Sequence, residues 1–240
     1  MLSGAADSAL STQHSALTMA VLVIIPAAGS GARFGGEIPK QFRALAGTPV
    51  LLRVIERFFT DERVANILVA VAEPLLANVK QTDRVRFVAG GATRQESVIR
   101  ALEAAEGDFE LVAVHDAVRP FFKSTSFHAL LDAAAAHGAS FPALPVTDTI
   151  HVTRGGRLVS TPERDQLVAA QTPQCFRIGI LHDVLDKARR DGVDGTDEAG
   201  LAARYGYEVR VLPGDAANFK ITRPEDLDYA EAHFEELSAP

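Results

Sequence analysis

Small residues follow the first apolar run of the chain, and two basic residues come soon after them. Residues 21–25 form the apolar run, and residues 26–36 read Pro-Ala-Ala-Gly-Ser-Gly-Ala-Arg-Phe-Gly-Gly. Small side chains let successive backbone N–H groups approach a phosphate closely. Arg33 in this segment and Lys40 just after it add positive charge. The segment is either a phosphate-binding loop that carries its own cations or an ordinary turn with solvated charges.

Two well-defined phosphate loops do not fit this segment. A Walker A loop needs Gly-Lys-Ser or Gly-Lys-Thr after its glycines, and neither follows here. A dinucleotide-binding loop needs a third glycine at the position that Phe34 occupies. It also needs an acidic residue at the end of the next strand, and Glu73 lies too far along the chain.

Apolar runs with β-branched residues alternate with segments of helical periodicity along the chain. This alternation predicts an α/β domain with a mostly parallel sheet flanked by helices. Ligands bind at the carboxyl ends of the strands in such sheets, which is where the glycine-rich segment lies. The predicted strands cover residues 21–25, 66–71, 85–88, 110–114, 139–146 and 208–212, and the predicted helices cover 50–59, 93–105, 124–137, 178–190 and 198–205, with a last helix from Pro224.

One segment departs from this alternation. Residues 149–153 and 158–161 are two short strand-like runs on either side of Arg-Gly-Gly-Arg, which predicts a β-hairpin. Two strands alone are marginally stable in water. We therefore expect this hairpin, with its flanks at about 147–165, to pack on the domain or on a second subunit. We refer to it as the hairpin arm.

The composition argues against several classes of protein. The chain has 240 residues, 47% of them hydrophobic and 23% charged, with a formal net charge of −7. This is enough for one domain, expected at residues 19–240 after a disordered tail at 1–18. The acidic balance argues against a nucleic-acid partner, and the longest apolar run is too short to span a membrane. The single cysteine, Cys175, excludes a disulfide framework and favours a cytoplasmic protein.

Several later segments carry a specific combination of residues. They are Gly90-Gly91 with Arg94 and Ser97-Val98, residues 114–120, Val146 with Asp148-Thr149, residues 171–174, residues 196–199, and residues 218–222 with 224–227. Together with the glycine-rich segment and Pro39-Lys40-Gln41, they resemble the 2-C-methyl-D-erythritol 4-phosphate cytidylyltransferases of non-mevalonate isoprenoid biosynthesis. The glycine-rich segment is common to nucleotidyltransferases, whereas the later segments are specific to this family and its sister pentitol-phosphate cytidylyltransferases. The resemblance spans about residues 20–236 and implies a single Rossmann-like nucleotidyltransferase domain.

The resemblance implies four cationic residues at the phosphates. Arg33 and Lys40 would hold the triphosphate of CTP and stabilise the transition state. Arg164 and Lys220 would hold the attacking phosphate in line. Arg164 lies on the hairpin arm and would reach into the site of a neighbouring subunit, which implies a homodimer.

The resemblance also implies two sets of binding residues. The nucleotide would be bound by Ala27, Ala28, Gly29, Gly31, Gly90, Gly91, Ser97 and Asp116. The polyol phosphate would be bound by Asp116, Arg119, Thr149, Arg164, Thr196 and Lys220.

The implied reaction is attack by a phosphate monoester on the α-phosphorus of CTP, with pyrophosphate leaving. A monoester is largely dianionic at neutral pH because its second pKa is near 6, so no general base is needed. The difficulty is electrostatic, and catalysis rests on positioning and positive charge. A Mg²⁺ ion bridging the triphosphate oxygens is expected, with Asp116 as a candidate ligand, directly or through water.

Other polar residues are expected to have structural roles. His115 is expected to be a hydrogen-bonded structural histidine, and Cys175 a small buried hydrophobe. Asp197 and Glu198 are expected to cap the helix that follows them, and Thr196 to combine capping with binding.

Two alternative functions stay open at this point. A sister enzyme that makes CDP-ribitol would share the loop and differ in the polyol pocket. A regulatory protein that binds nucleotide without catalysis would share the fold, although the presence of both Arg33 and Lys40 argues against it.

Overall fold

The computed structural model describes residues 19–29, 34 and 38–239 of the chain. The expected tail at 1–18 and the candidate site residues Gly31 and Arg33 lie outside these ranges.

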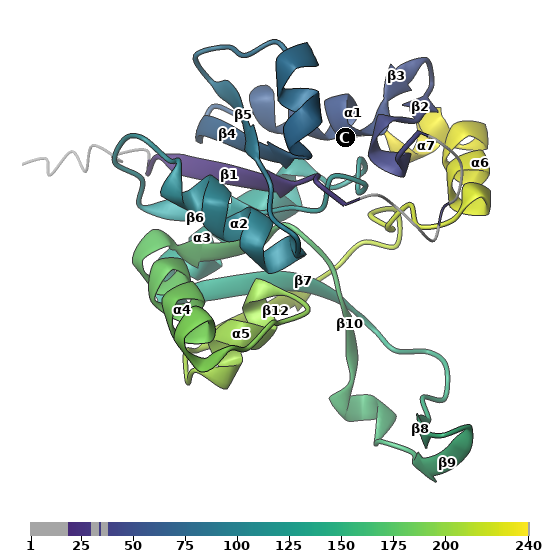
Figure 1. The fold of residues 1–240 in the computed structure, drawn as a ribbon. Helices are drawn as coiled ribbons and strands as arrows, with labels where there is room; N and C mark the ends of the chain where they lie inside the picture. Colours follow the sequence, from purple (N-terminus) through teal and green to yellow (C-terminus); the bar gives the residue numbers. More distant parts are fainter. Residues whose placement is uncertain (1–18, 30–33, 35–37, 240) are drawn as a thin grey trace, which may run out of the picture.

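An eight-stranded sheet forms the centre of the molecule (Figure 1). The strands β5, β4, β1 and β6 are neighbours in that order and run parallel. β11 then pairs antiparallel with both β6 and β7, and β12 runs parallel to β7. The predicted α/β class with a mostly parallel sheet is confirmed. The strands are β1 Val21–Pro26, β4 Val64–Val71, β5 Val85–Ala89, β6 Leu111–Val114, β7 Ala139–Pro145, β10 Val168–Ala170, β11 Gln174–Arg177 and β12 Val209–Pro213.

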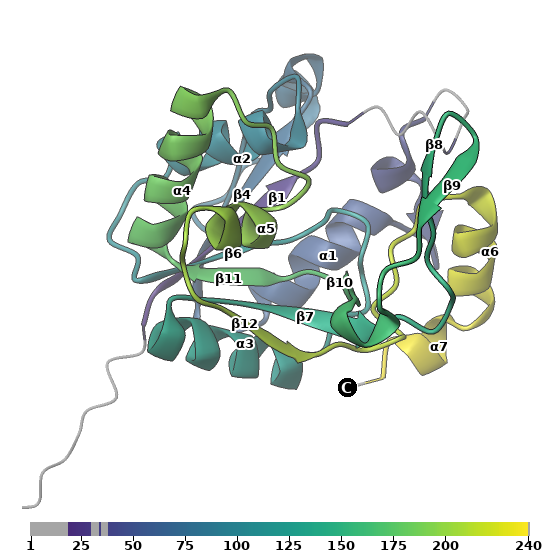
Figure 2. The same ribbon diagram turned by 90° about the horizontal axis from the view of Figure 1, so that it is seen from below.

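Helices cover both faces of this sheet (Figure 2). One face carries α1 Val50–Phe59 and α3 Ser124–His137, whose bounds agree with the predicted ones. The other face carries α2 Arg94–Glu103, α4 Ile178–Asp191 and α5 Glu198–Arg204. Among the described residues, no helix is both long and apolar enough to cross a lipid bilayer.

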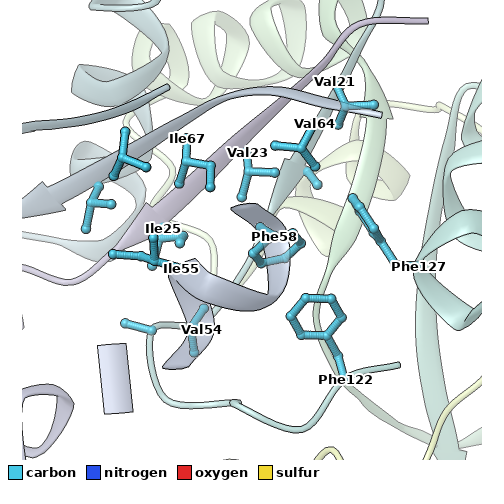
Figure 3. Close-up of a cluster of buried hydrophobic side chains, with 14 of the residues drawn as sticks. Val21, Val23, Ile25, Val54, Ile55, Phe58, Val64, Ile67, Phe122 and Phe127 are labelled. Atoms are coloured by element: carbon cyan, nitrogen blue, oxygen red, sulfur yellow. The ribbon is translucent and has the colours of Figure 1, made fainter. Parts of the chain in front are cut away.

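The side chains of β1 supply both layers of the core, because successive residues of a strand point to opposite faces. Val21, Val23 and Ile25 pack among residues of α1 and α3, such as Phe58 (Figure 3). The intervening Leu22 and Ile24 pack among residues of α2 and α4. Every β1 residue from 21 to 25 is completely buried. Burial of each such aliphatic side chain stabilises the fold by about 1.5–3 kcal/mol, so β1 is firmly held up to its carboxyl end.

A third apolar cluster lies beside the sheet. The helices α6 Pro224–Ala232 and α7 Phe234–Leu237 pack there against a small hairpin of β2 Ala44–Leu45 and β3 Thr48–Pro49. The predicted start of the last helix at Pro224 is confirmed, and the carboxylate of Asp226 accepts hydrogen bonds from the N–H groups of Thr222 and Arg223. Ile221 is fully buried in this cluster, which fixes the backbone next to Lys220.

The predicted hairpin is confirmed, with a shorter first strand and a second strand shifted by one residue. β8 Val152–Arg154 and β9 Arg157–Ser160 pair antiparallel and project away from the sheet (Figure 1). Gly155 and Gly156 have φ angles of 56° and 74°, the left-handed conformations that a tight turn of this kind needs. Every residue of both strands is exposed, and the single turn η3 Arg164–Gln166 leads back to the sheet.

The strands β10 and β11 were not predicted. They lie along one edge of β7 as two pieces of one antiparallel run. Ala170 pairs with Ala143 of β7, and Cys175 pairs with Ser140. Four residues, 171–174, lie between Ala170 and Cys175, whereas only residues 141 and 142 lie between their partners on β7. The extra residues bulge out of the strand and include the cis peptide bond between Thr172 and Pro173. Each piece is too short, and the proline too disruptive, for a period-two pattern to be recognised.

Candidate active site

A pocket of about 650 Å³ opens at the carboxyl end of β1. This is where the sequence predicted a candidate phosphate-binding loop. Four segments that are far apart in the chain line it: residues 26–29 with Lys40 and Gln41, residues 91–94 with Ser97, residues 116–118, and Lys220 with Thr222.

The described part of the glycine-rich segment is held from two sides. The side-chain amide of Gln41 donates to the carbonyl oxygens of Ala27 and Gly29, each at 2.8 Å. On the other side, Gly90 approaches Ala28 so closely that a Cβ on Gly90 would lie 2.4 Å from the Cβ of Ala28. A larger residue at position 90 would displace the loop, which explains a glycine there.

Ser97 organises the loop that carries Gly90 and Gly91. Its hydroxyl accepts a hydrogen bond from the N–H of Gly91 at 3.0 Å and donates to the carbonyl of Thr93 at 2.9 Å. Gly91 and Ser97 line the pocket, as expected for nucleotide-binding residues, while Gly90 supports it from behind.

Lys40 lies in the short turn η1 Lys40–Phe42 and lines the pocket. Its Nζ donates to the carbonyl oxygen of Ile221 at 2.9 Å, so it lies beside the segment of Lys220 although 180 residues separate them. Two of the four predicted cations, Lys40 and Lys220, therefore line one pocket.

Asp116, just past the end of β6, is surrounded by basic side chains. Its Oδ2 lies 2.9 Å from Nζ of Lys220 and 3.3 Å from Nε of Arg119, and its Oδ1 lies 3.4 Å from Nε of Arg94. Burial alone would raise the pKa of Asp116, but Lys220, Arg94 and Arg119 hold that pKa well below its usual range. The carboxylate is therefore ionised and holds these side chains in position.

Arg94 and Glu198 form a buried ion pair that was not predicted. Nη1 of Arg94 lies 2.7 Å from both carboxylate oxygens of Glu198, whose side chain is 1% exposed. Burial lowers the pKa of Arg94, but Glu198 and Asp116 outweigh it and raise that pKa above its usual range. Glu198 is a first-turn acid of α5, as predicted, but the expectation that capping is its main role is wrong, because its side chain turns inward to Arg94. The cap is Asp197, as predicted, whose carboxylate accepts from the N–H of Gly200 at 2.9 Å.

His115 and Thr172 hold the backbone of Asp116. The Nε2 atom of His115 lies 2.9 Å from the carbonyl oxygen of Arg119, so Nε2 carries the proton and Nδ1 is an acceptor. The hydroxyl of Thr172, 3.0 Å from Nδ1, then donates to it and accepts from the N–H of Asp116 at 3.0 Å. Burial lowers the pKa of His115 to about 3, so the ring is neutral. The predicted structural role of His115 is confirmed.

The bulge of residues 171–174 ties several parts of the site together. Thr172 belongs to this bulge, and so does Gln171. The side-chain amide of Gln171 donates to the carbonyl oxygens of Asp215 and Asn218. Gln174 donates to Asp197 and accepts from the N–H of Ala199. The sequence hints at this structural role only by placing several amide and hydroxyl side chains within residues 171–174. Their hydrogen-bond partners lie on remote segments and could not be predicted.

Four of the predicted substrate residues do not line the pocket of their own chain. Thr149 is exposed on the hairpin arm, and Arg164 donates to the carbonyl of Thr147 at the base of that arm. Thr196 is exposed before α5. Arg119 lies behind Asp116, where it also donates to the carbonyl of Asn218 at 2.8 Å.

The pocket offers few ligands to a metal ion. Within residues 19–29, 34 and 38–239, no three His, Cys, Asp or Glu side chains are grouped as a metal site. Asp116 is the acidic residue of the lining, and its Oδ2 already faces Lys220 and Arg119. Mg²⁺ usually needs only one or two carboxylates besides waters and substrate phosphates. The lining therefore offers a metal ion one carboxylate, that of Asp116, and other ligands such as water would have to complete the coordination.

Cys175 takes no part in this pocket. Its side chain is completely buried, and burial raises the pKa of its thiol. The prediction that Cys175 is a buried hydrophobe is confirmed.

Comparisons with known proteins agree with the resemblance over nearly the whole chain. The family model for 2-C-methyl-D-erythritol 4-phosphate cytidylyltransferase matches residues 21–236. A protein of that name from Symbiobacterium thermophilum is 44% identical over 231 residues, which cover 95% of this chain and 98% of that protein. Another from Solibacter usitatus is 43% identical over 239 residues, with coverage of 92% and 98%. The crystal structure of the protein of that name from Thermus thermophilus has a TM-score of 0.76 and 38% identity, and covers 89% of this chain and 98% of that one.

Proposed function

Because the chain belongs to the 2-C-methyl-D-erythritol 4-phosphate cytidylyltransferase family, we propose that its pocket binds CTP and 2-C-methyl-D-erythritol 4-phosphate. The enzyme is a cytidylyltransferase that transfers CMP and forms 4-diphosphocytidyl-2-C-methyl-D-erythritol and pyrophosphate. The observation that carries this proposal is the placement of Lys40 and Lys220 in one pocket at the end of β1.

The pocket suits a reaction in which an anion attacks a polyanion. The triphosphate binds at residues 27–29 and Lys40, with Arg33 supplying a further cation from the same loop. The polyol phosphate binds at Lys220, which the carboxylate of Asp116 already holds at 2.9 Å. Cations at both phosphates reduce the repulsion between them, and their fixed positions align the attacking oxygen with the α-phosphorus.

A Mg²⁺ ion is part of this proposal. When bound, it neutralises charge on the triphosphate and on the leaving pyrophosphate. Asp116 would hold it, directly or through water, since its Oδ1 faces only the more distant Arg94 at 3.4 Å.

The site is completed by a second subunit in this proposal. Arg164 and Thr149 lie on an arm that projects from the domain, away from the remainder of its own chain (Figure 1). The arm exposes large apolar side chains, with Leu158 62% and Val159 56% exposed. Apolar exposure of this kind is typical of a surface that a partner covers. A homodimer would cover these residues and bring Arg164 to the polyol phosphate of the partner.

Pyrophosphate release from CTP and Mg²⁺ tests the proposed function. The assay compares 2-C-methyl-D-erythritol 4-phosphate with ribitol 5-phosphate as acceptors. We expect product with the first and little with the second. Product with ribitol 5-phosphate alone would overturn the substrate assignment, and tight CTP binding without pyrophosphate release would favour a regulatory protein.

A further inference from the structure

Gln41 lines the pocket and lies against the backbone of residues 27–29. Its side chain is buried, with 4% of the residue exposed, and its Nε2 lies 2.8 Å from the carbonyl oxygens of both Ala27 and Gly29. Of the two polar atoms of the amide, only the nitrogen can donate a hydrogen bond to a carbonyl oxygen at this distance. The amide therefore donates both of its hydrogens to the loop, one to each carbonyl.

These two bonds fix the direction of the loop's peptide groups. A peptide group is planar and trans, so its C=O and N–H point in opposite directions. Because the carbonyl of Ala27 faces Gln41, the N–H of Ala28 faces away from Gln41. Gly90 packs against the side chain of Ala28, so the loop cannot rotate freely in either direction. Backbone N–H groups held in this way bind phosphate oxygens well.

We infer that Gln41 is a positioning residue that holds residues 27–29 in the conformation that binds the nucleotide. This inference rests on the proposed function of the pocket. Gln41 acts through the loop, whereas its neighbour Lys40 would contact the phosphates. Loss of Gln41 should therefore weaken CTP binding and leave the KM for the polyol phosphate unchanged.

Two substitutions test this inference. Gln41→Leu has a similar size and removes both donors, and Gln41→Glu keeps the shape but places carboxylate oxygens against two carbonyls. Since buried carbonyls that lose their partners are costly, we expect the Kd and KM for CTP to rise about tenfold in each variant. Gln81→Glu makes the same chemical change at an exposed residue outside the pocket lining and should bind CTP like the parent protein.

The pH dependence separates loop positioning from a general loss of stability. A protonated carboxyl group has one O–H to donate, so CTP binding by Gln41→Glu, relative to the parent, should improve as the pH falls. Gln41→Leu should show no such recovery. Calorimetric Kd values for CTP between pH 8 and 5.5, with thermal unfolding of each variant, provide the measurement.

Two results would overturn the inference. One is parental CTP affinity in a folded Gln41→Leu variant. The other, which decides the case if Gln41→Leu does not fold, is a Gln41→Glu variant whose CTP affinity relative to the parent is independent of pH. If the parent binds CTP but releases no pyrophosphate, the proposed function fails, while the same Kd values still decide the role of Gln41.

Discussion

Arg94 and Glu198 are 104 residues apart in the chain, and the Nη1 atom of Arg94 lies 2.7 Å from both carboxylate oxygens of Glu198. This pair joins the start of α2 to the start of α5 at the edge of the pocket. It also limits how closely Arg94 approaches Asp116, which lies 3.4 Å away.

Glu198→Gln should weaken both the fold and the site. Arg94 would lose its nearest charged partner, and its remaining carboxylate partner would be Asp116 at 3.4 Å. Charged hydrogen bonds contribute about 1.5–3 kcal/mol, so the free energy of unfolding should fall by about 2 kcal/mol. Chemical denaturation measures this change. Unchanged stability would mean that the pair makes no net contribution.

Lys220→Ala should impair use of the polyol phosphate more than use of CTP. The variant loses the cation that Asp116 holds at 2.9 Å, and kcat/KM should fall about 10²-fold. Steady-state kinetics with each substrate varied in turn measures the effect. Lys187→Ala, which removes a half-buried lysine paired with Asp183 outside the pocket lining, is the control and should remain fully active. An equal effect of Lys220→Ala on the two KM values would contradict the assigned role.

Lys40→Ala and Arg33→Ala should each slow CMP transfer by about 10²–10³-fold, as expected for the loss of a charge that stabilises the transition state. Pyrophosphate release in a single turnover at saturating CTP measures this step without product dissociation. A double variant that retains parental rates would exclude the proposed electrostatic mechanism.

Arg164→Ala and Lys220→Ala should complement each other when the two variants are coexpressed. If the arm serves the partner's pocket, a mixed dimer contains one intact pocket facing one intact arm. Half of the randomly assembled dimers are mixed, and activity should return to about one quarter of the parental value. Arg164 acting within its own chain would leave the mixture as inactive as the separate variants.

The neutral state of His115 makes stability depend on pH. The folded protein lowers the pKa of this histidine to about 3, from about 6.5 when unfolded, so the unfolded state binds the proton more readily. The contribution of the neutral ring to the free energy of unfolding is complete above pH 6.5. This contribution is lost as the pH falls toward 3, at up to about 1.4 kcal/mol per pH unit. Denaturation of the parent and of His115→Gln at pH 7, 6 and 5 gives the slope of the free energy of unfolding against pH for each protein. The parent should lose more stability than the variant as the pH falls, and equal slopes would contradict this role of His115.

Local patterns predicted much of the fold. The apolar run of β1, the periodicity of α1 and α3, and the glycines of the hairpin arm are properties of consecutive residues. The turn of small residues after β1 was predicted for the same reason, while phosphate binding by this turn stays a prediction. The roles of Glu198 and Thr172 could not be predicted, because each depends on a partner that the folded sheet brings close. A capping role for Glu198 was reasonable from its position, but burial against Arg94 outweighed it.

Asp116 shows how an acidic protein can gather positive charge in one pocket. Three basic side chains converge on this one carboxylate, and without it they would repel one another. Its negative charge therefore assembles the cations before any ligand is bound. In the proposed function, an incoming phosphate would meet cations that are already in place and need not be recruited from solvent. A protein with a net charge of −7 can thereby maintain a local positive field without a basic surface.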